Sequence, residues 1–122
     1  MRKLAIVLGC LLLVCSVSLH AKPAFSGTYS IKGVNPATAG AYAGTLTISP
    51  RGDIYDVLWV IGSVKYGGVG VVSGDTLSVA YAAADYSFMG VMAYTARANG
   101  LDGKWAVYGG ATKTGTETAT RK

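Results

Sequence analysis

From Phe25 to the end of the chain, apolar and polar residues alternate with a period of two, and turn-forming residues interrupt the alternation every 8 to 14 residues. No stretch has apolar residues at i, i+3, i+4 and i+7, the spacing of an amphipathic helix. Because successive side chains of a strand point to opposite faces, this pattern predicts half-buried β-strands. We therefore expect an all-β protein with strands at residues 25–33, 42–49, 54–61, 64–72, 76–82, 88–97, 101–108 and 112–121.

Most of the expected connections are short and have the residues that tight hairpins require. These residues are Pro50-Arg51-Gly52-Asp53, Gly62-Ser63, Gly74-Asp75, Asn99-Gly100 and Gly109-Gly110. Only residues 34–41 and 83–87 are expected to form longer loops, and both should lie at the rim of the space that the strands enclose. Eight hairpin-linked strands can close on themselves, which removes the exposed edges of an open sheet. The predicted fold is an eight-stranded antiparallel up-and-down β-barrel, a closed meander.

The first 21 residues have the features of a signal peptide. Arg2 and Lys3 precede an apolar run from position 4 to position 17, and the small residue Ala21 follows where a signal peptidase could cut. The run is too short to span a bilayer as a helix, so the mature chain is expected to have no transmembrane span. We predict a signal peptide at 1–21, a single barrel domain at 22–122, and export to the periplasm or the extracellular space. Soluble export is favoured over lipid anchoring at Cys15, because Val14 is a poor residue before an acylated cysteine.

Both cysteines and the single histidine lie within that export segment. The remaining chain therefore lacks the thiolates and imidazoles of most transition-metal sites, a cysteine nucleophile and a Ser-His-Asp triad. Its six acidic residues show no sign in the sequence of converging on one site. We expect no enzymatic activity, no catalytic residues, no metal and no cofactor. The basic residues are scattered, so no specific nucleic-acid partner is predicted.

One parity of each expected strand has the large apolar side chains and should face inward. This predicted core comprises Phe25, Tyr29, Ile31, Tyr42, Leu46, Ile48, Tyr55, Val57, Trp59, Ile61, Tyr66, Val72, Leu77, Val79, Tyr81, Phe88, Met92, Tyr94, Leu101, Trp105 and Val107. Most strands also place a glycine on the inward parity, as in Gly90-Val91-Met92 and Gly103-Lys104-Trp105. Such glycines let strands coil sharply and leave room for large rings. An eight-stranded barrel can be filled by side chains or can hold one small ligand, and both alternatives remain open here.

Glu117 lies on the inward parity of the last expected strand, between Gly115 and Ala119. A carboxylate inside a small barrel must find a partner or change its pKa. It could form a structural hydrogen bond to a Tyr or Trp near the barrel mouth, or it could recognise a ligand. If the interior is open, the expected ligand-binding residues are Tyr29, Tyr42, Trp59, Tyr94, Trp105 and Glu117.

The outward positions of the third to sixth strands are apolar, whereas the first, second and last strands have Thr, Ser and Lys outside. The expected partner surface comprises Leu58, Val60, Val69, Val71, Met89 and Val91. Contiguous apolar patches on exported proteins usually mark an interface, so a homodimer through this outer face is one expectation. A one-residue slip in the parity of the fourth or sixth strand would instead turn these residues inward.

The motifs Gly27-Thr28-Tyr29, Tyr42-Ala43-Gly44-Thr45-Leu46, Gly90-Val91-Met92-Ala93-Tyr94 and Asp102-Gly103-Lys104-Trp105 together resemble those of a group of small exported bacterial proteins. Most members are uncharacterised, and some are labelled as fibronectin-binding or surface proteins. The architecture is also similar to barrels of the avidin and lipocalin type. The resemblance implies a secreted or surface-exposed binding module whose partner is a host-matrix or cell-surface protein. The alternative is a carrier that binds a small apolar or aromatic ligand in the barrel mouth.

Overall fold

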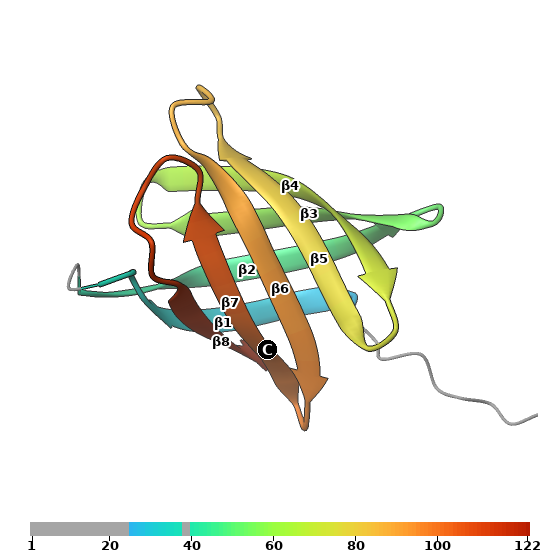
Figure 1. The fold of residues 1–122 in the computed structure, drawn as a ribbon. Helices are drawn as coiled ribbons and strands as arrows, with labels where there is room; N and C mark the ends of the chain where they lie inside the picture. The colour runs from blue at the N-terminus through green and yellow to red at the C-terminus, as the bar shows by residue number, and fades with distance from the viewer. Residues whose placement is uncertain (1–24, 38–39) are drawn as a thin grey trace, which may run out of the picture.

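The computed structural model describes residues 25–37 and 40–122, and these form a closed barrel of eight strands (Figure 1). The strands are β1 Gly27–Val34, β2 Ala41–Arg51, β3 Ile54–Ile61, β4 Val64–Ser73, β5 Thr76–Ala83, β6 Met89–Arg97, β7 Gly100–Val107 and β8 Gly115–Arg121. Each strand pairs antiparallel with the next, and β8 pairs with β1 to close the barrel. The prediction of an all-β, eight-stranded antiparallel meander is confirmed. The predicted signal peptide lies outside the described residues.

The strand bounds follow the alternation closely, with one clear exception before β8. The sequence predicts a tight hairpin at Gly109-Gly110 and a strand from residue 112, but β8 begins only at Gly115. A turn does form at Gly109, where φ is 72°, yet pairing between β7 and β8 ends at Trp105 opposite Gly115. Residues 108–114 lie outside the β7–β8 ladder and form a third long loop, and the run Thr112-Lys113-Thr114 is polar throughout and does not alternate.

The connections divide the barrel into two ends (Figure 1). The loops β1–β2, β5–β6 and β7–β8 and the turn β3–β4 lie at one end, which we call the loop end. The three remaining turns and the end of β8 lie at the other, which we call the closed end. The predicted longer loops at 34–41 and 83–87 therefore do share one rim. Among the described residues, no helix has the length and apolarity needed to cross a membrane.

The closed end is sealed by contacts between the two ends of the barrel sequence. Phe25 is fully buried there, and Tyr29 Oη donates a hydrogen bond of 2.7 Å to its carbonyl oxygen. Arg121 donates from Nη1 to the Ser26 carbonyl at 3.0 Å, and its guanidinium lies over the Tyr29 ring. Because a cation over an aromatic face is attracted to the ring quadrupole, this contact joins β8 to β1 as well as covering the core.

The interior is formed by the predicted inward parity on every strand. Fourteen of the predicted core residues are buried, and six more are half-buried and packed against them. Val72 is the error: it is 39% exposed, because it lies one residue before the end of β4, beside the solvent-facing β4–β5 turn. Alternation correctly places Val72 on the inward side of β4. It does not show that side chains at the end of a strand extend beyond the core and reach solvent.

Candidate functional site

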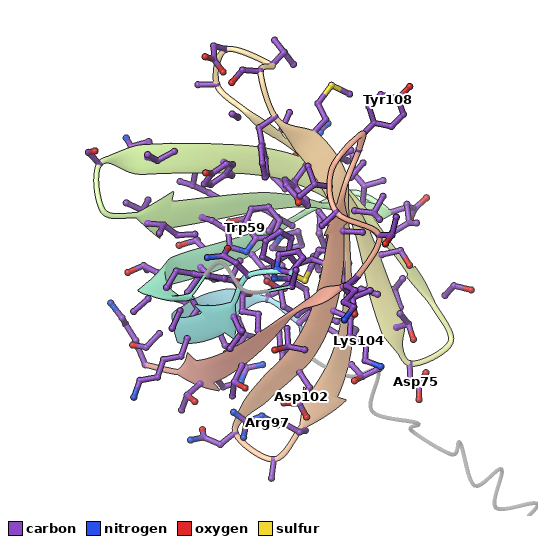
Figure 2. The ribbon with its side chains drawn as sticks, turned by 60° about the vertical axis from the view of Figure 1, so that its left-hand side comes forward. Trp59, Asp75, Arg97, Asp102, Lys104 and Tyr108 are labelled. Atoms are coloured by element: carbon purple, nitrogen blue, oxygen red, sulfur yellow. The ribbon has the colours of Figure 1, made fainter. Side chains whose placement is uncertain are left out.

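The loop-end half of the barrel contains a cavity of about 260 Å³. Its wall comprises Asn35, Tyr42, Trp59, Ile61, Tyr66, Tyr81, Phe88, Met92, Trp105 and Glu117. Tyr66, Phe88 and Ile61 are half-buried and form part of the rim, whereas Trp59 and Met92 are buried deeper. Figure 2 shows the Trp59 side chain within the barrel, with the loop residue Tyr108 pointing away from it. The interior is thus filled at the closed end and hollow at the loop end.

Aromatic rings make up most of the cavity wall and brace one another. The ring of Trp59 meets that of Tyr81 nearly edge to face at a centroid distance of 5.6 Å. Tyr66 lies 5.9 Å from Phe88, and Tyr42 lies 6.0 Å from Trp105. Such geometries are favourable because the positive edge of one ring approaches the negative face of another. The contacts hold the wall in place without filling the space between the rings.

Inward glycines create the space that these rings occupy. A Cβ atom added at Gly33 would overlap the Tyr42 ring, and one added at Gly115 would overlap the Trp105 ring. At Gly33 and at Gly115, any residue with a side chain would displace the ring that lies over the glycine. The inward glycine pattern in the sequence determines where the bulky side chains can lie, and through them the shape of the cavity.

Glu117 is the single carboxylate in the cavity wall, and only 3% of its surface is exposed. Tyr42 Oη donates to its Oε1 at 2.8 Å, and Tyr94 Oη donates to its Oε2. Trp59 Nε1 donates in turn to Tyr94 Oη at 2.9 Å, which extends the network across the barrel. The prediction that Glu117 points inward is confirmed. Its backbone lies between glycines on both neighbouring strands, Gly33 of β1 and Gly103 of β7.

Burial raises the pKa of the Glu117 carboxyl above its ordinary value, and the hydrogen bonds from Tyr94 and Tyr42 oppose that rise only in part. No cationic side chain forms an ion pair with Glu117 in the described part of the chain, where the ion pairs are Arg51–Asp56 and Arg97–Asp102. The carboxyl is therefore held by neutral donors alone, an arrangement that leaves its negative charge uncompensated when it ionises.

The tyrosines around the carboxyl remain protonated at neutral pH. Burial, together with the nearby Tyr66 and Glu117, raises the pKa of Tyr81 to about 12. Burial and then the Glu117 charge also raise the pKa values of Tyr42 and Tyr94. Their hydroxyls thus act as hydrogen-bond donors to Glu117. Trp105 Nε1 is buried beside Tyr42 without a well-aligned hydrogen bond to any described residue.

The residues proposed from the sequence divide between the two ends of the barrel. Tyr42, Trp59, Trp105 and Glu117 line the cavity. Tyr94 is fully buried outside the cavity wall and is linked to it by its hydrogen bonds with Glu117 and Trp59. Tyr29 lies at the closed end and is not part of the wall, because its hydroxyl is bonded to the Phe25 carbonyl.

The sequence interpretation omitted six residues of the wall: Asn35, Ile61, Tyr66, Tyr81, Phe88 and Met92. All except Asn35 had been placed inside the barrel by parity, but parity does not give the height of a residue along the barrel axis. A usable signal was present in the sequence, since Ile61, Tyr66 and Phe88 each lie within three residues of a loop-end connection.

The predicted partner surface is exposed on the outside of β3 to β6. Val91 is the most exposed of its members at 60%, Leu58, Val69, Val71 and Met89 are also exposed, and Val60 is half-buried. The register places Val69, Ala80, Val91 and Ala106 next to one another across β4 to β7. The parity slip considered for the fourth and sixth strands does not occur, and a continuous apolar face results.

No protein-family model matches the sequence, and no curated protein matches it either. Among solved structures, one described as REP1-NXSQ fatty acid transporter matches with a TM-score of 0.54 and 11% sequence identity, over 80% of this chain and 95% of the other. At that identity the likeness concerns the fold alone, which the two proteins share over most of both chains. The expectation of fibronectin or host-matrix binding receives no support from these comparisons and stays a prediction. In residues 25–37 and 40–122, no group of three or more His, Cys, Asp or Glu side chains could hold a metal ion.

Proposed function

We propose that this protein is a carrier that binds a small, largely apolar or aromatic molecule in the loop-end cavity. The observation that carries the proposal is a hollow of about 260 Å³ lined by rings and aliphatic side chains around one buried carboxyl. Binding sites for small molecules typically combine an apolar wall with a few polar groups that fix orientation. The fold-level likeness to a fatty acid transporter barrel supports the same class of function.

The volume limits the size of the ligand. Sites for drug-sized molecules measure roughly 300–1,000 Å³, so a cavity of about 260 Å³ suits a smaller molecule, such as a single substituted ring or a short branched chain. The closed-end half of the barrel offers no additional depth, because Tyr29, Leu46 and Leu77 fill it. A long alkyl chain would have to extend past Tyr66 and Phe88 into solvent.

Binding can be measured directly, because the chain has two tryptophans and both lie in the cavity wall. We expect 2-phenylethanol, a small neutral aromatic compound, to change the intrinsic fluorescence and to shift the indole N–H signals of Trp59 and Trp105 in NMR spectra. Ile61→Trp places a larger ring in the rim of the cavity and should weaken binding at least tenfold by calorimetry. Leu58→Trp, on the outer side of the same strand, is the control and should not weaken it. Unchanged affinity in the Ile61 variant would mean that the ligand binds elsewhere.

We also infer that the protein has no catalytic role. The five aspartates in the described residues are all exposed, and none lines the cavity, so Glu117 has no second carboxylate with which to share general acid–base chemistry. The predicted signal peptide supports export and an extracytoplasmic role. Mass spectrometry of the exported protein should give the mass of a chain that begins at Lys22, and a lipidated chain that begins at Cys15 would contradict soluble export.

A second candidate function rests on the apolar outer face rather than the cavity. Val69, Val71 and Val91 are exposed on this face, and exposed apolar patches of this kind favour association with a second copy of this chain or with an extracellular or surface protein. We test the second copy. Light scattering at millimolar concentration should show a dimer that the Val91→Lys variant lacks, and a wild-type monomer under those conditions would exclude self-association through this face.

A further inference from the structure

We propose that the ligand of the loop-end cavity carries a protonated amine, and that Glu117 is the residue that recognises it. The inference rests on the carrier function proposed above and specifies the chemistry of its head group. It depends on the charge and contacts of Glu117, on the character of the wall around it, and on the positions of the basic residues of the chain.

Glu117 has acceptor capacity that its protein partners leave unused. Each carboxylate oxygen can accept about two hydrogen bonds. The structure gives each oxygen one tyrosine donor, Tyr42 on Oε1 and Tyr94 on Oε2, and the Trp59 indole is a third donor beside the carboxyl, so part of the acceptor capacity stays free. An ammonium group has several N–H donors and the opposite charge. An ammonium group would donate to the remaining acceptor positions and neutralise the carboxylate in the same contact. Such a charge-assisted hydrogen bond is stronger than a hydrogen bond between neutral groups.

No basic side chain of the described chain provides that neutralisation. Lys32, Lys65 and Lys104 have exposed side chains outside the cavity wall. Arg97 and Arg121 lie at the closed end, where their guanidinium groups bond to the carbonyl oxygens of Ala119 and Ser26. A buried acid without an internal cation is costly for a fold when it is ionised. The cavity thus presents an uncompensated acidic group to whatever enters it.

The ring-lined wall suits a cation for a second reason. The faces of Trp and Tyr rings are electron-rich and attract ammonium groups, most strongly where water is excluded. Trp59, Tyr81 and Trp105 are all buried and line the same cavity as Glu117. The apolar remainder of the molecule would then lie toward the rim, against Phe88 and Ile61.

The same arrangement disfavours an anionic ligand. A carboxylate head group would bring a second negative charge near Glu117 in a site of low dielectric constant, where like charges repel strongly. An Arg or Lys in the wall would compensate that charge, but no basic residue is among the described residues that line the cavity. The likeness to a fatty acid transporter should therefore extend to the barrel but not to the head group of the ligand.

Three probes of nearly equal shape separate these alternatives: 2-phenylethylamine, 2-phenylethanol and phenylacetate. Titrating each into the full barrel at neutral pH, by calorimetry and by tryptophan fluorescence, should give the tightest binding for the amine. We expect about a tenfold or greater preference over the alcohol, and the weakest binding for phenylacetate. In Glu117→Gln the amine and the alcohol should bind alike. Asp102→Asn removes an exposed carboxylate from β7 and is the matched control, in which the preference should persist.

The possible outcomes distinguish this inference from the proposed function. If the alcohol binds the wild-type protein as tightly as the amine, or phenylacetate binds most tightly, the amine inference is wrong while the carrier function stands. A folded Glu117→Gln protein that keeps the preference for the amine would also overturn it. If none of the three probes binds, the carrier function fails as well. The wild-type series decides the question even if the Glu117 variant does not fold.

Discussion

Replacing Tyr94 with Phe tests the buried hydrogen-bond network that surrounds Glu117. Tyr94 is fully buried, donates to Glu117 Oε2 and accepts from Trp59 Nε1 at 2.9 Å. The substitution keeps the ring and its packing but removes the one atom that serves both partners. It therefore takes one hydrogen bond from the buried donor Trp59 Nε1 and one from the buried acceptor Glu117 Oε2. Removing one partner of a buried hydrogen bond costs more than replacing both partners by apolar groups.

The expected loss follows from the two interactions. An unsatisfied buried donor costs about 1–3 kcal/mol, and a hydrogen bond to a charged group contributes about 1.5–3 kcal/mol, so we expect Tyr94→Phe to lower the free energy of unfolding by about 2.5–6 kcal/mol. That is a large part of the roughly 5–15 kcal/mol by which small domains are stable. The loss should grow as the pH rises through the raised pKa of Glu117, because only the ionised carboxyl carries the charge that the Tyr94 hydroxyl stabilises.

Urea unfolding followed by far-UV circular dichroism measures this quantity, provided that the slope m is the same for both proteins. The control is Tyr108→Phe, which removes the same atom from a side chain that is 86% exposed in the β7–β8 loop (Figure 2) and should change stability by less than about 0.5 kcal/mol. A loss below about 1 kcal/mol in the Tyr94 variant at pH 7 would refute the reasoning. It would mean that water or a rearranged Glu117 replaces both hydrogen bonds.

Three further predictions concern the same barrel. Burial raises the pKa of Glu117 in the folded state above 4.5, so the folded chain binds the carboxyl proton of Glu117 more tightly than the unfolded chain does. The free energy of unfolding should therefore fall as the pH rises from about 4.5 through the raised pKa. Urea titrations over that range should show a flatter dependence for Glu117→Gln, and an identical slope in both proteins would exclude the assignment. Gly103→Ala should lower the free energy of unfolding by about 1–3 kcal/mol, because the new Cβ would lie 2.8 Å from Cε1 of Tyr94. Gly67→Ala, which meets no atom within 4 Å, is its control, and equal effects of the two would contradict the close-packing argument. Phe25→Ala should cost about 3–5 kcal/mol by opening the closed end, while thermal unfolding indistinguishable from wild type would show that Phe25 does not seal it.

The barrel itself could be predicted because its main determinants are local. The alternation from Phe25 onward assigns each side chain to one face of its strand, and the short turns make consecutive strands antiparallel neighbours. Closure is then expected, because an open sheet of these eight strands would leave the first and the last strand as exposed edges. The inward direction of Glu117 follows in the same way from its position between Gly115 and Ala119, and the structure buries all three.

The candidate site could be predicted only in part, because alternation gives the side of the sheet but not the height along the barrel. Tyr29 and Tyr42 have the same inward parity, yet Tyr29 lies at the closed end under Arg121 and Tyr42 lies in the cavity beside Glu117. Height depends on strand tilt and on the stagger between paired strands, which are properties of the closed sheet as a whole. The β7–β8 loop was missed for a different reason: Gly109-Gly110 indicates a tight hairpin, and no local pattern shows that pairing between the two strands ends at Trp105 and Gly115.

By itself, the sequence determined the all-β class, the eight strands, their order and the inward or outward direction of nearly every side chain. These properties depend on neighbours within a few positions of one another in the chain. Only the tertiary structure decided that the two ends of the interior differ, one filled and the other hollow. Tyr42 reaches Glu117 across 75 positions of sequence, and such a pair is formed by the stagger of strands around a closed barrel, which no local pattern records.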